Sequence, residues 1–247
     1  MYTPEVILEN YNKLKYEIRN ITDKDIQIIS VTKAHEPEIF QVCSELKIKH
    51  VGENRIQELK EKCTLFPDAR KELYVHFIGN LQANKAKYLP GRINSLDTLD
   101  NLNLLEILNK KWREHKEGED KLSVLIQINS TGEAGKSGIN YNNYDELINL
   151  AKKCMDSESI NLEGLMTMGP TPVEEKGETI ESQSYREATE RAFLCTRDLK
   201  KKLEDDLQYA LPRLSMGMTH DFSIAIPCGA TEIRVGSFIF GPRLVRR

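Results

Sequence analysis

Eight short apolar runs alternate with helical segments along almost the whole chain, and this alternation limits the possible folds more than any other feature. The runs are rich in branched residues and lie at 26–32, 48–52, 73–78, 93–96, 122–129, 161–167, 213–216 and 232–235. The segments of helical character between them lie at 37–47, 54–64, 80–89, 100–116, 141–156, about 184–207, and 219–228. A further helix precedes the first run, since Pro4 suits a first helical turn and apolar residues follow at helical spacing.

Strands that alternate with helices eight times over 247 residues predict a (β/α)8 barrel. The alternative is an open doubly wound sheet, which usually has about five or six strands and a glycine-rich turn after the first. Here Thr-Lys-Ala-His, without glycine, follows the first strand, which favours the barrel. We therefore expect an α/β protein, a TIM barrel with an extra N-terminal helix, as a single domain over residues 1–247. The polar stretch 169–184 is expected to be a long loop after the sixth strand, on the active face.

Composition excludes several classes of protein. A net charge of −3 with both signs mixed argues against a nucleic-acid platform, which usually carries a basic face. The five cysteines are scattered without a C-x-x-C pair, and no His-Glu-x-x-His motif occurs, so we expect no disulfide framework and no metal site. The N-terminus does not have the pattern of a secretory signal, and no stretch approaches the roughly 18 apolar residues of a membrane span. We expect a cytoplasmic protein.

Lys33 ends the first apolar run, and barrel chemistry takes place at the C-terminal ends of strands. A lysine in such a place is most often a solvated charge, so the last run matters. Its alternation directs Ile233 and Val235 toward the helices and Arg234 into the barrel lumen. A guanidinium there is costly unless it is paired. Arg234 therefore either forms an ion pair with Glu232 or contacts a ligand.

Serine and glycine lie at the ends of the last two strands, where barrels commonly bind phosphate. Gly236 and Ser237 follow the eighth strand, and Ser215 and Gly217 end the seventh. Either turn alone could be ordinary loop chemistry, but both together favour a phosphate site. Because the first and last strands of a closed ring are neighbours, the Lys33 amine would lie beside this site. That pair of groups is what lysine-bound pyridoxal phosphate (PLP) requires.

Short motifs along nearly the whole chain resemble those of the pyridoxal phosphate homeostasis family, the YggS and PROSC type. In chain order they are Ser30-Val31-Thr32-Lys33, Val51-Gly52-Glu53-Asn54, His76-Phe77-Ile78-Gly79, Leu81-Gln82-Ala83-Asn84-Lys85, Gln127-Ile128-Asn129, Lys136-Ser137-Gly138, Gly164-Leu165-Met166, Leu214-Ser215-Met216-Gly217-Met218 and Arg234-Val235-Gly236-Ser237. So many matches in order are highly specific. The resemblance implies the fold of the alanine racemase N-terminal barrel domain.

The resemblance also implies roles for individual residues. Lys33 would form an internal aldimine with PLP, and Arg234 would face the pyridine nitrogen. The phosphate would be held by Ser215, Gly217, Gly236 and Ser237, and Asn54 would be a further neighbour of the cofactor. The chain departs from the family pattern at Thr32, Ser237 and Pro242, and in Ala34-His35-Glu36-Pro37 after the lysine. None of these changes removes a needed group, but His35 could alter the loop around the cofactor.

Three functions remain open at this point. The first is a PLP carrier in vitamin B6 and amino-acid homeostasis, without robust catalysis, which we expect to be monomeric and to supply PLP-dependent apoenzymes. The second is a single-domain racemase or lyase that uses His76 as its base, although an interior hydrogen-bonded histidine is an equally good interpretation. The third is an aldolase-like barrel whose Lys33 forms a Schiff base without a cofactor.

Two arguments favour the carrier. A permanent cation at Arg234 disfavours protonation of the ring nitrogen and makes the ring a poor electron sink. The related racemases take a tyrosine base from a second β domain, and only residues 238–247 follow the Gly236-Ser237 turn after the last predicted strand.

Overall fold

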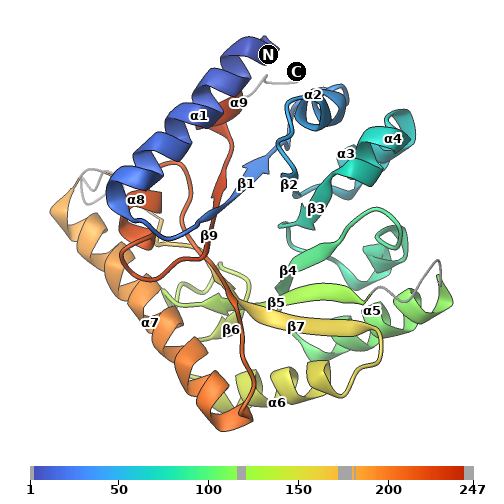
Figure 1. Cartoon of the computed structure of the whole chain (residues 1–247). Coiled ribbons are helices and arrows are strands. Elements are labelled where there is room, and N and C mark those ends of the chain that lie inside the picture. The colour runs from blue at the N-terminus through green and yellow to red at the C-terminus, as the bar shows by residue number, and fades with distance from the viewer. Residues whose placement is uncertain (1–2, 116–120, 172–179, 181, 242–247) are drawn as a thin grey trace.

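Within residues 3–115, 121–171, 180 and 182–241, which the computed structural model describes, eight parallel strands close into a ring (Figure 1). They are β1 Gln27–Val31, β2 His50–Glu53, β3 Tyr74–Phe77, β4 Ser95–Leu99, β5 Leu122–Asn129, β7 Ile160–Thr167, β8 Arg213–Ser215 and β9 Glu232–Val235. Pairing of β4 with β5 closes the order β4-β3-β2-β1-β9-β8-β7-β5, and the two-residue strand β6, Ile139–Asn140, adds to β5. This arrangement confirms the predicted (β/α)8 barrel.

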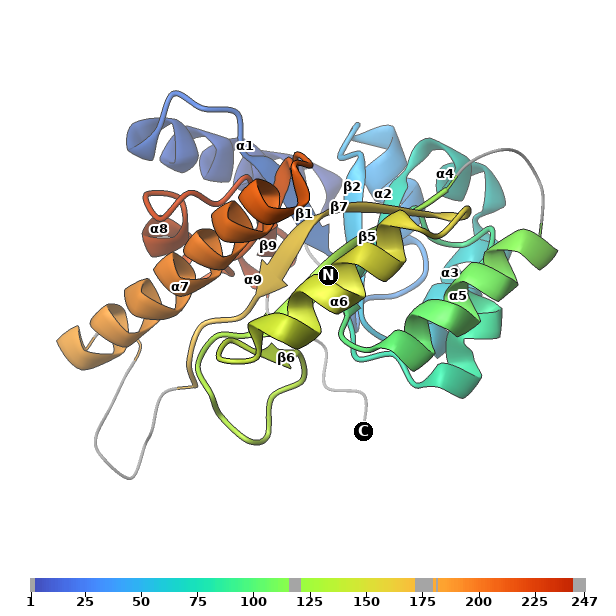
Figure 2. The same ribbon diagram turned by 90° about the horizontal axis from the view of Figure 1, so that it is seen from below.

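Helices surround the ring, and α1 is the predicted extra N-terminal helix. Their bounds are α1 Pro4–Ile21, α2 Ile39–Glu45, α3 Ile56–Leu65, α4 Pro67–Glu72, η1 Ala83–Tyr88, α5 Leu102–Glu114, α6 Tyr144–Met155, α7 Gln183–Leu207, α8 Phe222–Ala225 and α9 Ser237–Phe240. Figure 2 shows α5, α6 and α7 side by side along one flank. Of the predicted loop 169–184, residues 172–179 and 181 lie outside the described residues, as does Pro242.

Two prolines explain where the helices differ from the sequence prediction. Pro67 cannot continue α3, so the chain turns at Phe66 and starts the unpredicted helix α4 with Pro67 in its first turn. The predicted helix at 80–89 is instead the short 3-10 helix η1, which ends just before Pro90 because the residue before a proline avoids the α region.

Side chains of the strands form two layers, one toward the helices and one inside the lumen. All eight residues of β5 are buried, as expected for a parallel strand covered on both faces. On the helix side, α6 contributes Leu147, Leu150 and Ala151 to the core. Each such fully buried leucine stabilises the fold by about 1.5–3 kcal/mol.

The first and last strands lie side by side, as the closed ring requires. In their register Ile29 pairs with Arg234, and Ser30 pairs with Val235. The strand ends approach each other so closely that a Cβ on Gly236 would lie 3.1 Å from the carbonyl oxygen of Val31. The segment after β1 therefore shares one edge of the barrel with the turn after β9.

The cysteines and the helices bear on two further predictions, that of no disulfide framework and that of no membrane span. All five cysteines are described, and they are free thiols. No described helix combines the length and the apolar character needed to cross a membrane.

Candidate functional site

Lys33 lies between two cavities at the C-terminal edge of the ring. The larger, of about 310 Å³, is lined by Lys33, Arg234, Gly236 and Ser237 among the predicted site residues. The smaller, of about 80 Å³, is lined by Lys33 and Asn54, with Ala34 and Arg55. Five of the seven predicted cofactor residues, the half-buried Lys33 among them, thus line these two cavities.

Arg234 projects into the lumen, as the strand alternation predicts, and is only 5% exposed. Its guanidinium donates to Ser215 Oγ at 2.7 Å and to the carbonyl oxygen of Thr167 at 2.8 Å. Burial lowers the pKa of Arg234, but an arginine remains a cation because its ordinary pKa lies far above neutral pH. The possible ion pair with Glu232 is not formed, because the Glu232 carboxylate accepts from Arg213 instead. Both bonded partners of Arg234 are therefore neutral groups.

The residues predicted to hold phosphate divide into two pairs. Gly236 and Ser237 line the larger cavity, together with Thr219, whose hydroxyl lies 3.4 Å from that of Ser237. Ser215 and Gly217 line neither of the two cavities beside Lys33. Ser215 instead holds Arg234, and the carbonyl of Gly217 accepts from the Arg234 backbone N–H at 2.9 Å. The second pair therefore supports the arginine.

Gly217 has a conformational reason to be glycine. Its φ is +97°, a left-handed backbone that favours glycine, and a Cβ there would lie 2.7 Å from Cβ of Ala225. The turn after β8 consequently packs directly on α8.

Asn54 carries a buried oxygen, Oδ1, that has no hydrogen-bond partner. A buried acceptor without a donor costs about 1–3 kcal/mol, so a ligand that supplies a donor here would be favoured. Gly79 allows this placement, because a Cβ on Gly79 would lie 2.3 Å from the backbone oxygen of Asn54.

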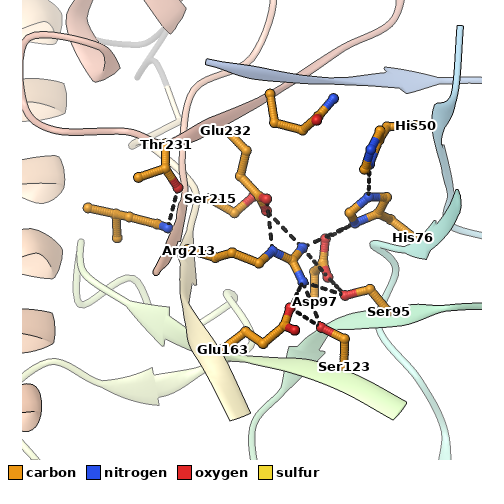
Figure 3. A network of polar contacts seen from close by, with 12 residues as sticks. His50, His76, Ser95, Asp97, Ser123, Glu163, Arg213, Ser215, Thr231 and Glu232 are labelled. Atoms are coloured by element: carbon orange, nitrogen blue, oxygen red, sulfur yellow. Dashed lines mark hydrogen bonds and ion pairs between the residues drawn. The ribbon is translucent and has the colours of Figure 1, made fainter. Parts of the chain in front are cut away.

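His76 is not at the cavity that Lys33 lines. It is 1% exposed and belongs to a polar network deeper in the lumen, where its Nδ1 lies 2.9 Å from Asp97 Oδ2 and its Nε2 lies 3.1 Å from His50 Nδ1 (Figure 3). The geometry therefore favours the interpretation of His76 as an interior hydrogen-bonded histidine over its interpretation as a catalytic base.

Arg213 is the centre of this network, and Figure 3 shows its guanidinium surrounded by acidic and hydroxyl groups. Its ion pairs with Glu163 and Glu232 are both 2.9 Å long, and that with Asp97 is 3.2 Å long. Burial alone would raise the pKa of Asp97, but His76 and Arg213 outweigh it and hold the pKa below its usual range.

Three of these side chains have the spacing of a metal site. Ligand atoms of His76, Asp97 and Glu232 all lie within 4.8 Å of one another. The Arg213 guanidinium already bonds to both carboxylates, Asp97 and Glu232, and its fixed positive charge beside them disfavours a second cation. We therefore expect no metal ion among these three residues.

Several residues of the larger cavity were missed by the sequence prediction of the site. They include His220 and Met218, which follow the serine-glycine turn of β8, and Met168, which follows β7. Their positions directly after strands were an available signal. His35 also lines this cavity, and its ring lies 5.4 Å from that of Phe240.

Comparison with known proteins decides the family. The chain is 34% identical over 220 residues to the pyridoxal phosphate homeostasis protein of Aquifex aeolicus, covering 88% of this chain and 87% of the relative. It is 32% identical over 222 residues to that of Schizosaccharomyces pombe, covering 89% and 85%. The chain belongs to the pyridoxal phosphate homeostasis protein family. The family model for the alanine racemase N-terminal domain also matches residues 6–243.

Solved structures agree with this assignment. PipY of Synechococcus elongatus, determined with PLP bound, is 25% identical and has a TM-score of 0.77, over 95% of this chain and 100% of that chain. An alanine racemase of Clostridium difficile has a TM-score of 0.69 at 18% identity. The match covers 96% of this chain but only 57% of the racemase chain. The racemase therefore shares the barrel fold.

Proposed function

We propose that this protein binds PLP reversibly as an imine of Lys33 and serves intracellular PLP, vitamin B6 and amino-acid homeostasis. The observation that carries the proposal is the shared cavity. Lys33, just after β1, lines the same cavity as Arg234, Gly236 and Ser237 at the end of β9. The family membership, and the PLP bound in PipY, support the same conclusion.

The residues present fit the chemical groups of PLP. Gly236 and the hydroxyls of Ser237 and Thr219 suit a phosphate, and Arg234 suits the ring nitrogen because a guanidinium only donates hydrogen bonds. The partnerless Oδ1 of Asn54 can accept a hydrogen bond beside Lys33. PLP supplies a reactive aldehyde. The Lys33 amine is the group of this cavity that would condense with the aldehyde to an imine, with loss of one water and without any oxidation or reduction.

Holding PLP is favoured over catalysis by the same geometry. Arg234 keeps its charge beside the ring, which weakens the ring as an electron sink. Among the described residues that line the larger cavity, the titratable side chains besides Lys33 and Arg234 are His35 and His220. A racemase would need one of these as a second base besides the Lys33 amine, since His76 lies in the Arg213 network.

The proposal also covers the domain organisation, the oligomeric state, the location and the partners of the protein. Residues 1–247 form one PLP-binding domain, which acts as a monomer in the cytoplasm and supplies PLP-dependent apoenzymes. The ring of strands supports the single domain, because it is closed by β1 and β9 from opposite ends of the chain.

Borohydride trapping tests the central claim. Hydride reduction converts a C=N bond into a stable amine, so peptide mapping after reduction of the PLP-loaded protein should find the label on Lys33. Lys33→Ala should lose both the label and the visible absorbance. Lys47→Ala is a matched control, since Lys47 is 74% exposed and far from the cavity lining, and it should retain both.

Label on another lysine would refute the assignment. A wild-type protein that forms no coloured complex with PLP would instead support the aldolase-like alternative. Robust turnover of D- or L-amino acids by the loaded protein would support the racemase or lyase.

A further inference from the structure

Two side chains of one helix hold the backbone on both sides of Lys33. Glu58 Oε2 accepts from the backbone N–H of Ala34 at 2.7 Å, and Lys62 Nζ donates to the carbonyl oxygen of Thr32 at 2.7 Å. Glu58 and Lys62 are four residues apart on α3 and therefore face the same way. The residue between the two anchored positions is the proposed PLP lysine.

Lys62 is an unusual residue for an anchor because its charge is wholly buried. Its side chain is 1% exposed, and its partner Glu53 is 0% exposed, with Nζ and Oε1 2.6 Å apart. Such a pair seldom stabilises a protein more than apolar side chains of the same volume would, so stability alone explains it poorly. Burial raises the pKa of Glu53, and Lys62 opposes this shift.

The buried pair holds the hydroxyl and the carbonyl of Thr32, and the neighbouring strand holds its N–H. The Thr32 hydroxyl donates to Glu53 Oε1 at 2.6 Å, its N–H donates to the carbonyl of Gly52 at 3.0 Å, and its carbonyl accepts from Lys62. Glu53 directly precedes Asn54, which lines the smaller cavity beside Lys33. The same cluster thus connects the ends of β1 and β2 at the site.

Ala34, on the other side of Lys33, has a conformation that needs support. Its φ of +60° lies in the left-handed region, which residues other than glycine seldom adopt. The hydrogen bond from Ala34 N–H to Glu58 holds this turn, and Glu58 is itself paired with Arg55 at 3.1 Å. Loss of Glu58 would release the turn toward an extended backbone and redirect the chain at Lys33.

We propose that Glu58, Lys62 and Glu53 are positioning residues that fix the turn containing Lys33, so that its amine is presented to the aldehyde of PLP. This inference rests on the proposed function. Fixing the backbone removes conformational freedom that imine formation would otherwise have to restrict, which increases the effective concentration of the amine. The cluster therefore acts on the covalent step, while the groups around Arg234 and Ser237 act on ring and phosphate.

Two ligands separate positioning from general damage to the fold. PLP can form the imine, whereas pyridoxine 5'-phosphate carries an alcohol in place of the aldehyde and cannot. Glu58→Ala should bind PLP about tenfold more weakly, the scale of one hydrogen bond to a charged group, and should be reduced by borohydride more slowly. Its affinity for pyridoxine 5'-phosphate should stay at the wild-type value, because the phosphate and ring contacts are intact.

Matched variants of the same helix complete the design. Glu58→Gln keeps an acceptor for Ala34 N–H and should restore PLP affinity, and the exposed Glu61→Ala should have no effect. Lys62→Met with Glu53→Gln removes both buried charges together and leaves the Thr32 carbonyl with only the longer bond of 3.4 Å from the His35 N–H, so it should behave like Glu58→Ala. The exposed Lys60→Met is its control.

The outcomes are distinguishable. Wild-type PLP affinity and trapping rate in Glu58→Ala, or equal weakening of both ligands, would overturn the inference. The Glu58 variants decide the matter even if the double variant does not fold, since the Glu58 side chain is 16% exposed and at the edge of the core. Absence of label on Lys33 in the wild type would overturn the proposed function itself.

Discussion

The two arginines of the barrel lumen carry the same charge in very different surroundings. Arg213 is surrounded by the carboxylates of Asp97, Glu163 and Glu232, whereas Arg234 bonds to one hydroxyl and one carbonyl oxygen. The positive charge of Arg213 is therefore compensated by bonded carboxylates, whereas Arg234 has neutral bonded partners and lines the cavity proposed to hold PLP. Strand alternation could predict the inward direction of Arg234, but not its partners. Glu232 pairs with Arg213 because β8 and β9 are neighbours, which is a property of the closed ring.

His50 gives the network a measurable dependence on pH. Burial lowers the pKa of His50 to about 4, from an ordinary 6.5, and the groups that add to this shift are His76, Arg213 and Lys49, with Asp97 opposing it. The folded state thus favours neutral His50, while the unfolded chain binds a proton below about pH 6.5. His50 consequently contributes stability above pH 6.5 that is lost as the pH falls toward 4.

We predict that the free energy of unfolding falls between pH 6.5 and 4 less steeply in His50→Gln than in the wild type. Denaturant unfolding at several pH values measures the two slopes. Glutamine can still bond to His76, so the loss of a titrating group is the main change. Equal slopes would mean that His50 has the same pKa in the folded protein as in the unfolded chain.

At the scale of elements, the turns after the strands determine the site. The eight strands and their order could be predicted, because the alternation of apolar strands and helices is a local pattern. The ends of the helices were predicted less accurately. The break between α3 and α4 depends on Pro67, and the anchoring of the Lys33 turn by α3 depends on contacts between residues 20 to 30 positions apart. The Val-Gly-Glu-Asn motif included Glu53, but nothing in the sequence identified Lys62 as its partner.

Gly79 tests how closely the turns after β2 and β3 must approach. Because a Cβ on Gly79 would lie 2.3 Å from the Asn54 oxygen, Gly79→Ala must move one of the two backbones. We expect a loss of about 1–3 kcal/mol in unfolding free energy, the usual cost of overpacking, together with weaker PLP binding. Gly135→Ala is the control, since a Cβ there meets nothing within 4 Å. Similar stability of both variants would show that the Asn54 turn is not held at that distance.

At the scale of the whole molecule, closure of the ring brings the two ends of the sequence into one site. Residues 33 and 234 are about two hundred positions apart, yet β1 pairs with all four residues of β9. The sequence predicted this closure from the number of strands. It could not predict the Arg213 network, which combines β3, β4, β7, β8 and β9 and exists only once the ring is complete. A ligand that bridges the first and last strands should therefore oppose opening of the ring.

We predict that PLP stabilises the whole fold, because it would bridge β1 and β9. At a free concentration of about 100 times its dissociation constant, a ligand that binds only the folded state adds about 2.7 kcal/mol to the free energy of unfolding. Protein freed of cofactor should therefore melt at a higher temperature as PLP is added, and thermal unfolding followed by circular dichroism measures the shift. Lys33→Ala should show a smaller shift at the same PLP concentration, because it retains ring and phosphate contacts but cannot form the imine. A wild-type melting temperature that does not change when PLP is added would contradict binding between β1 and β9.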